Sequence, residues 1–184
     1  MRKLFLTVGF LVGVVALQAQ EKFGNRLNLS VGTSYGNGYY YGHSFPLMLN
    51  YEFDVARNFT LAPFISFYTY SNYYITQNPR KNFYAYQYNY RTVVVPVGVK
   101  GSYYFDELLN AGEKWDFYAA VSLGFAFRST TWEDGYVVKD VPYTESGIYL
   151  NFHAGAEYHF TEKIGMFLDL SSGSSNIGMS IKVR

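Results

Sequence analysis

Three side chains near residue 155 belong to the types that perform acid–base chemistry or bind metals. His153 and Glu157 are four residues apart, and His159 follows two residues later. In an extended strand all three share one face, because side chains alternate between faces with a period of two. Imidazole and carboxylate groups so placed can transfer protons or ligate a divalent ion. The sequence marks no further ligand and no nucleophile beside them, so packing in a polar interior is the favoured interpretation.

A second candidate is the pair His43 and Ser44, in a segment where a lipid acyltransferase would place catalytic groups. A lone His-Ser pair is a weak signal. The chain contains no Gly-x-Ser-x-Gly, HExxH, P-loop or dinucleotide-binding motif. We therefore predict a protein that is not an enzyme, with no catalytic residue, no metal site and no cofactor. A lipid A-modifying enzyme, to be tested at His43 or His153, is kept as an alternative.

The elements that carry these residues are predicted to be strands. From Ile148 to Phe160 every second residue is apolar or small, and the residues between them are mostly polar or Gly. Eight segments show this alternation, and no convincing helix is predicted. Their approximate ranges are 26–36, 45–53, 59–70, 90–105, 115–129, 146–160, 163–171 and 176–184.

The connections between these segments alternate in length. Those after the second, fourth and sixth segments are short or moderate, whereas the other side includes long loops near 71–89 and 130–145. This pattern is typical of an antiparallel up-and-down transmembrane β-barrel, all-β, with both termini on the periplasmic side. Pro63 and Pro96 fall inside segments and lack a backbone donor, so we expect a bulge or an unpaired position at each.

The N-terminus reads as a secretory signal peptide over residues 1–19, followed by one barrel domain over residues 20–184. Arg2 and Lys3 precede an apolar run from Leu4 to Leu17, and Ala19 suits the cleavage position. Loss of two positive charges changes the net charge from +1 to −1, which provides no basic field for nucleic acid. The chain has no Cys, which excludes disulfides and a lipoprotein anchor.

The polar face of the segments is rich in small residues and in charges of both signs. Small size suits the narrow interior of an eight-stranded barrel, and buried charges are tolerated only when paired. We therefore predict that this face points inward and that the apolar face, with aromatic residues towards both ends, contacts lipid. The predicted ion network of the interior is Arg26, Glu52, Lys100, Asp116, Arg128, Glu157, Asp169 and Lys182. Arg128 and Asp169 are expected near the end opposite to the other six.

The two long loops are rich in aromatic residues. The first and its flanks hold eight tyrosines together with Arg80, Lys81 and Arg91. Tyr is a frequent contact residue at recognition surfaces. Binding of a surface ligand or envelope partner and a purely structural aromatic sheet among lipopolysaccharide headgroups are both open interpretations. The predicted loop contacts are Tyr73, Tyr74, Arg80, Lys81, Tyr84, Tyr86, Trp132, Tyr136 and Tyr143.

With these features the chain resembles the small eight-stranded outer membrane barrels of Gram-negative bacteria, of the OmpA transmembrane domain and OmpX type. The LQAQE region and the strand RTVVVPVGVKGSYYF resemble barrel proteins of the Bacteroidetes. Such barrels commonly end in an aromatic residue, whereas this chain ends SIKVR. The resemblance implies the outer membrane, contact with its lipid and lipopolysaccharide, and a structural or surface-interaction role. A small pore or hydrophobic-compound channel and a soluble periplasmic ligand-binding barrel with reversed faces are the further alternatives.

Overall fold

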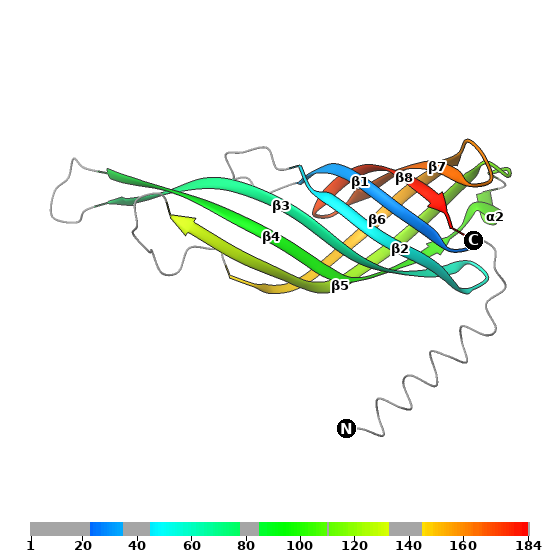
Figure 1. Cartoon of the computed structure of the whole chain (residues 1–184), viewed down its shortest axis with the longest axis horizontal. Helices are drawn as coiled ribbons and strands as arrows, with labels where there is room; N and C mark the ends of the chain where they lie inside the picture. Colours follow the sequence, from blue (N-terminus) through cyan, green and yellow to red (C-terminus); the bar gives the residue numbers. More distant parts are fainter. Residues whose placement is uncertain (1–22, 35–44, 78–84, 110, 133–144, 184) are drawn as a thin grey trace, which may run out of the picture.

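Eight β-strands make up most of the described chain. The computed structural model describes residues 23–34, 45–77, 85–109, 111–132 and 145–183; the predicted signal peptide lies outside them. The strands are β1 (Arg26–Ser34), β2 (Leu47–Ala56), β3 (Phe59–Gln77), β4 (Ala85–Tyr104), β5 (Trp115–Trp132), β6 (Gly147–His159), β7 (Ile164–Ser171) and β8 (Ser174–Lys182) (Figure 1). A one-turn helix, α2 (Asp106–Leu109), lies between β4 and β5, where no helix was predicted.

The strands close into a barrel. Each strand pairs antiparallel with the next, and β8 pairs with β1 from Arg26–Lys182 to Ser34–Ser174. The predicted eight-stranded antiparallel barrel is therefore confirmed. Arg26 and Lys182 are neighbours, so the described chain begins and ends at the same end of the barrel. We call it the short-turn end, because it also carries the turn at Arg57–Asn58 and the turn at 161–163.

The two faces of the sheet have the orientation that the sequence predicts. On β1, Leu29 is 59% exposed and its neighbour Ser30 is 4% exposed; on β5, Leu123 is 60% exposed and Ser122 is fully buried. The same alternation runs along β2, β7 and β8. Side chains alternate between the two faces of the sheet, so the apolar residues of a strand all lie on the same face, and in these strands that face is the outer one. The interior consequently holds the charged and small polar residues.

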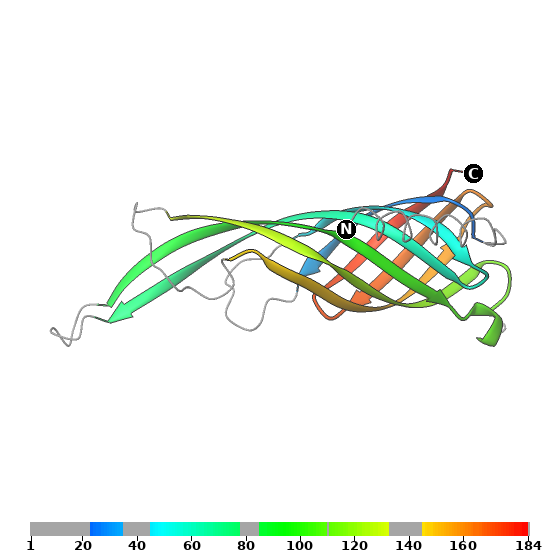
Figure 2. The same ribbon diagram turned by 90° about the horizontal axis from the view of Figure 1, so that it is seen from below.

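Strands β3 and β4 continue far beyond the rest of the barrel. They pair from Ser71–Arg91 to Gln77–Ala85, so most of the loop predicted near 71–89 is in fact a hairpin (Figures 1 and 2). The prediction was wrong because Tyr, Thr and Ile favour strands. β5 accompanies β4 only as far as the pair Tyr90–Trp132. We call residues 68–77, 85–94 and 128–132 the extension.

Both prolines interrupt the hydrogen-bonded ladder on one side without shifting it. Pro63 pairs with Val99 of β4, but on the β2 side the pairing skips from Asn50–Phe64 to Phe53–Leu61. Pro96 pairs with Ala126 of β5, while the β3 ladder skips from Ile65–Val97 to Tyr68–Val94. The expected unpaired position is confirmed at each proline. A register shift occurs instead between Asp54 and Ala56 of β2.

In the described part of the chain, no helix has the length and apolar character needed to cross a membrane.

Candidate functional site

A group of ionisable side chains lies inside the barrel at the short-turn end. We call Arg26, Asp116, Glu157 and His159 the mouth cluster. Asp116 of β5 is the direct cross-strand partner of Glu157 of β6, and both are buried. Two like charges in such a position repel each other unless a cation bridges them. Arg26 of β1 supplies that cation: Nη1 lies 2.9 Å from Glu157 Oε2 and Nη2 lies 3.3 Å from Asp116 Oδ2.

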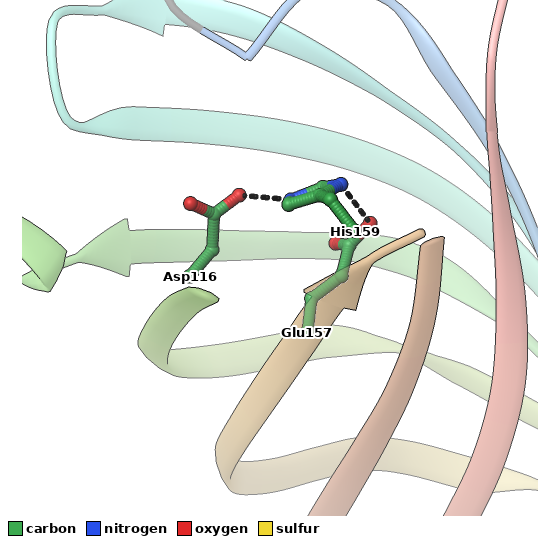
Figure 3. Close-up of side chains that lie close together, drawn as sticks. All are labelled: Asp116, Glu157 and His159. Carbon is green, nitrogen blue, oxygen red and sulfur yellow. Dashed lines mark hydrogen bonds and ion pairs between the residues drawn. The ribbon is translucent and has the colours of Figure 1, made fainter. Parts of the chain in front are cut away.

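His159 completes the mouth cluster from the same face of β6 as Glu157. Its Nε2 lies 2.7 Å from Asp116 Oδ2, and its Nδ1 lies 3.7 Å from Glu157 Oε1. Figure 3 shows the imidazole between the two carboxylates. Arg26, Asp116 and His159 also line a cavity of about 600 Å³, together with residues of the short turns. The cluster is thus next to a cavity large enough for several water molecules.

A second group lies further along the interior. We call Lys100, Tyr118, Ser122, His153 and Asp169 the inner cluster. Asp169 is its centre: the carboxylate lies 3.2 Å from Lys100 Nζ, accepts a 2.8 Å hydrogen bond from the Tyr118 hydroxyl and lies 2.7 Å from His153 Nδ1. Lys100 Nζ also lies 4.8 Å from the centre of the Tyr118 ring. Each polar group of Asp169 is therefore satisfied although the side chain is buried.

Ser122, His153 and Asp169 have the hydrogen-bond order of a hydrolase triad. Ser122 Oγ lies 2.9 Å from His153 Nε2, and His153 Nδ1 lies 2.7 Å from Asp169 Oδ1. A nucleophile must also be reachable by substrate and face donors for an oxyanion. Ser122 is fully buried. Asp169, the carboxylate that contacts His153, also contacts Lys100 and Tyr118. This geometry favours a packed polar interior over nucleophilic catalysis.

The remaining predicted network residues are placed differently. Glu52 is not ion-paired with any described residue; it accepts hydrogen bonds from Thr60, Tyr104 and Asn28. Lys182 lines the cavity next to the mouth cluster and likewise makes no ion pair within the described residues. Arg128 lies apart from both clusters and donates to the backbone carbonyl of Glu145.

Asp169 is not near the end where Arg128 lies. It was expected there because it falls late in its strand. β7 has 8 residues and β4 has 20, so the far part of β7 reaches only the level of Lys100.

Inward-facing aromatic side chains are the feature that the sequence reasoning missed. Phe23, Tyr104 and Tyr118 are 2–3% exposed and pack in a row: the Phe23 and Tyr104 rings are stacked with centres 4.1 Å apart, and the Tyr104 and Tyr118 rings are tilted with centres 5.5 Å apart. Phe64 and Phe167 are also buried. Aromatic residues were predicted on the outer face, although Tyr104 and Tyr118 alternate in step with Ser102 and Asp116, which are on the inner face. The sequence does contain this information, because each of these tyrosines follows an inward-facing polar residue by two positions.

Most of the predicted loop contacts fall outside the part of the chain whose side chains are described. Tyr73 and Tyr74 are on β3 and Tyr86 is on β4, so these three are in strands and not in a loop. Trp132 ends β5 and packs on Tyr90, with ring centres 4.8 Å apart. Arg80, Lys81, Tyr84, Tyr136 and Tyr143, as well as His43 and Ser44, lie outside the described residues.

Comparison with known proteins identifies the fold. No protein-family model and no curated protein matches the chain. Among solved structures, Neisserial surface protein A aligns with a TM-score of 0.50 and 12% identity over 86% of this chain and 95% of that one. A de novo designed transmembrane β-barrel aligns with a TM-score of 0.48 and 14% identity over 90% of this chain and 100% of the design.

Ail, the attachment invasion locus protein of Yersinia pestis, aligns with a TM-score of 0.47 and 11% identity over 85% and 95% of the two chains. At such low identity the likeness is one of fold alone. The fold of the chain, a closed eight-stranded antiparallel barrel, is thus similar to that of Neisserial surface protein A.

Proposed function

We propose that the protein is a non-enzymatic outer membrane β-barrel that crosses the bilayer with its strands and acts through its surface. One observation carries the proposal: the faces are inverted relative to a water-soluble barrel. Large apolar side chains cover the outside, and ionised side chains fill the inside. Their exposed fractions include 59% for Leu29, 60% for Leu123, 53% for Phe127 and 52% for Met179.

The outer face matches a lipid environment better than water. Soluble proteins rarely expose contiguous apolar patches above a few hundred Å². In lipid, a closed barrel satisfies its backbone groups between strands and exposes only apolar side chains. Aromatic residues flank this face: Tyr51, Tyr103 and Phe160 are exposed towards the short-turn end and Phe45 and Phe67 towards the other. Such girdles are typical of the two membrane interfaces.

A soluble barrel with an apolar ligand cavity would require the opposite arrangement. Its interior would hold the leucines and valines, and its exterior would hold the charges. Here Arg26, Glu52 and Lys100 are 6%, 2% and 4% exposed. Moving such charges out of water costs several kcal/mol each unless they are paired, so these residues are incompatible with an apolar cavity.

The proposed orientation places the short-turn end in the periplasm and the extension outside the cell, among lipopolysaccharide. The predicted signal peptide over residues 1–19 supports export, and short periplasmic turns with longer outer connections are typical of such barrels. Both termini are then periplasmic. Arg26 at the start of β1 pairs with Lys182 at the end of β8, so the first strand begins and the last strand ends at the short-turn end.

The proposed surface role rests on the extension. Among the described residues, no strand pairs with β3 beyond Phe67 on its β2 side, while β4 pairs with it up to Gln77. An unpaired strand edge offers backbone groups to an incoming segment. The tyrosines of this hairpin, Tyr73, Tyr74 and Tyr86 among them, together with Arg80 and Lys81, are the proposed contacts for a surface ligand or an envelope protein.

The absence of cysteine in the chain allows a clean test of this topology. Lys81→Cys lies in the predicted outer loop, and Glu162→Cys lies in the exposed turn between β6 and β7. A maleimide attached to a polymer too large for porins is applied to intact cells and to cells with a permeabilised outer membrane. We expect labelling of Lys81→Cys in both and of Glu162→Cys only after permeabilisation.

Fractionation supplies the control for insertion itself. The protein should remain with the outer membrane and change its gel mobility only after heating in detergent. Release into the periplasm without detergent contradicts membrane insertion. Retention in the membrane with the reverse labelling pattern contradicts only the orientation.

A further inference from the structure

One carboxylate oxygen of the mouth cluster accepts no hydrogen bond from a described residue. Glu157 is 2% exposed, and its Oε2 is bound by Arg26 at 2.9 Å. Its Oε1 is buried and makes no hydrogen bond to a described residue. A buried carboxylate oxygen without a hydrogen-bond donor is costly, because burial separates it from water. This oxygen is next to the His159 ring (Figure 3).

The His159 ring presents a second unshared electron pair to the same place. Asp116 Oδ2, 2.7 Å from Nε2, can only accept a hydrogen bond when ionised, so Nε2 carries the proton. In neutral imidazole Nδ1 is then an acceptor. Nδ1 faces Glu157 Oε1 across 3.7 Å. With a neutral ring, two acceptors therefore face each other, and this distance is also too long for a hydrogen bond from a protonated ring.

We propose that His159 Nδ1 and Glu157 Oε1 are ligands of a divalent transition-metal ion, of which Zn²⁺ is the representative. Zinc binds imidazole nitrogen and carboxylate oxygen at about 2.0–2.2 Å. The distance of 3.7 Å between Nδ1 and Oε1 is shorter than the sum of two such metal–ligand bonds, so one ion can bind both atoms. Donor atoms of Asp116, Glu157 and His159 all lie within 4.8 Å of one another.

Asp116 acts in this site through the histidine. A ring that ligates a metal with one nitrogen commonly donates its other N–H to a carboxylate, which fixes the orientation of the ring and raises its basicity. The 2.7 Å contact between Asp116 Oδ2 and His159 Nε2 has this arrangement. The bond is present without the ion, so the ring is already held with Nδ1 towards Glu157.

The neighbouring strand and the local charge favour the ion further. Gly165 of β7 is the cross-strand partner of His159, and a Cβ there would lie 2.5 Å from Glu157 Oε1 and 3.2 Å from His159 Nδ1. A glycine keeps this space clear. With Arg26 charged and the His159 ring neutral, as in a metal-bound imidazole, the two carboxylates leave the mouth cluster with one net negative charge, which a cation offsets.

Water from the mouth cavity can fill the remaining coordination positions. Asp116 and His159 line this cavity of about 600 Å³, which also touches the short turns. The site is independent of the proposed surface role, because it depends only on the interior geometry at the short-turn end.

Zinc binding to the folded mature chain in detergent micelles tests the proposal by calorimetry. We expect one Zn²⁺ per chain and at least tenfold weaker binding in His159→Ala, whose side chain is 18% exposed. His43→Ala is the matched control, because it removes a histidine outside the cluster and should bind as the wild type does. Heat-dependent gel mobility verifies that each variant is folded. Asp116→Asn, which keeps the side-chain shape, should weaken binding by about tenfold through the ring, and it replaces His159→Ala if that variant fails to fold.

Nitrogen-15 NMR of the imidazole identifies the coordinating atom. Zinc should shift Nδ1 of His159 and leave Nε2 protonated. Equal binding by wild type and His159→Ala, loss of binding in His43→Ala, or coordination through Nε2 each overturns the proposal.

Discussion

At the scale of single residues, the ionised groups inside the barrel are joined in small clusters, in which one group contacts several partners. Arg26 binds both Asp116 and Glu157, which face each other across β5 and β6. Lys100 binds Asp169, which is also held by Tyr118 and His153. Desolvation of a charge is offset only when most of its polar atoms find partners. The polar interior is therefore a set of small clusters and not one ring of alternating charges.

Removal of Arg26 should destabilise the barrel strongly. Arg26→Met leaves Asp116 and Glu157 buried opposite each other with no bridging cation, which should lower the free energy of unfolding by about 3–5 kcal/mol. Lys182→Met is the control: Lys182 is only partly buried and has no ion pair among the described residues, so its removal should change stability by about 0.5 kcal/mol or less. Urea unfolding in lipid vesicles measures both. Equal losses in the two variants would contradict the bridging role of Arg26.

At the scale of elements, the extension and the barrel body depend on different interactions. In the body each strand has neighbours on both sides, and the outer face is apolar. The outer part of the β3–β4 hairpin, from Tyr73–Asn89 to Gln77–Ala85, has described pairing only within itself. In the described strand pairing, these pairs involve no other strand of the body. This part of the hairpin therefore extends beyond the barrel.

Shortening this hairpin should leave the barrel intact. Replacing residues 73–89 by Asn-Gly joins Asn72 to Tyr90, which are already paired, through a two-residue turn. We expect heat-dependent gel mobility to persist and the free energy of unfolding to change by about 1 kcal/mol or less.

A substitution in the middle of the outer face provides the contrast. Leu123→Arg places a charge on the proposed lipid-facing surface and should cost about 2–4 kcal/mol. Failure of the shortened chain to fold, or a neutral Leu123→Arg, would show that this division between body and extension is wrong.

At the scale of the whole molecule, aromatic and charged side chains occupy the interior in the half of the barrel near the short-turn end. Phe23, Tyr104 and Tyr118 pack across it, and the mouth and inner clusters occupy the space around them. An eight-stranded barrel has an interior just wide enough for its own side chains. A continuous water path is not compatible with such packing, so we propose that the barrel is plugged and does not act as a pore or channel.

Conductance in planar bilayers tests whether the barrel is plugged. The wild type should show no steady conductance. The double variant Tyr104→Ala, Tyr118→Ala removes two of the three packed rings and should admit ions, at some cost in stability from the cavity. Phe127→Ala, on the outer face where the residue is 53% exposed, is the control and should conduct no more than the wild type. Steady conductance by the wild type would restore the pore as a function.

The sequence by itself determined the strands, their number and the orientation of their faces. Side chains alternate with a period of two, so the small polar residues of one phase and the leucines and valines of the other had to point in opposite directions. Short and long connections on opposite sides were sufficient to predict the up-and-down barrel. The interrupted pairing at Pro63 and Pro96 followed from the missing backbone donor alone.

Only the tertiary structure decided which side chains meet. Asp116 joins Glu157 and His159 because β5 and β6 pair in one particular register, and Arg26 reaches them from β1 across the interior. Ser122 joins His153 and Asp169 in the same way. Alternation along a strand says which face a residue occupies but not its height, which depends on strand length, tilt and stagger. For this reason Asp169 was expected near Arg128 and lies instead beside Lys100.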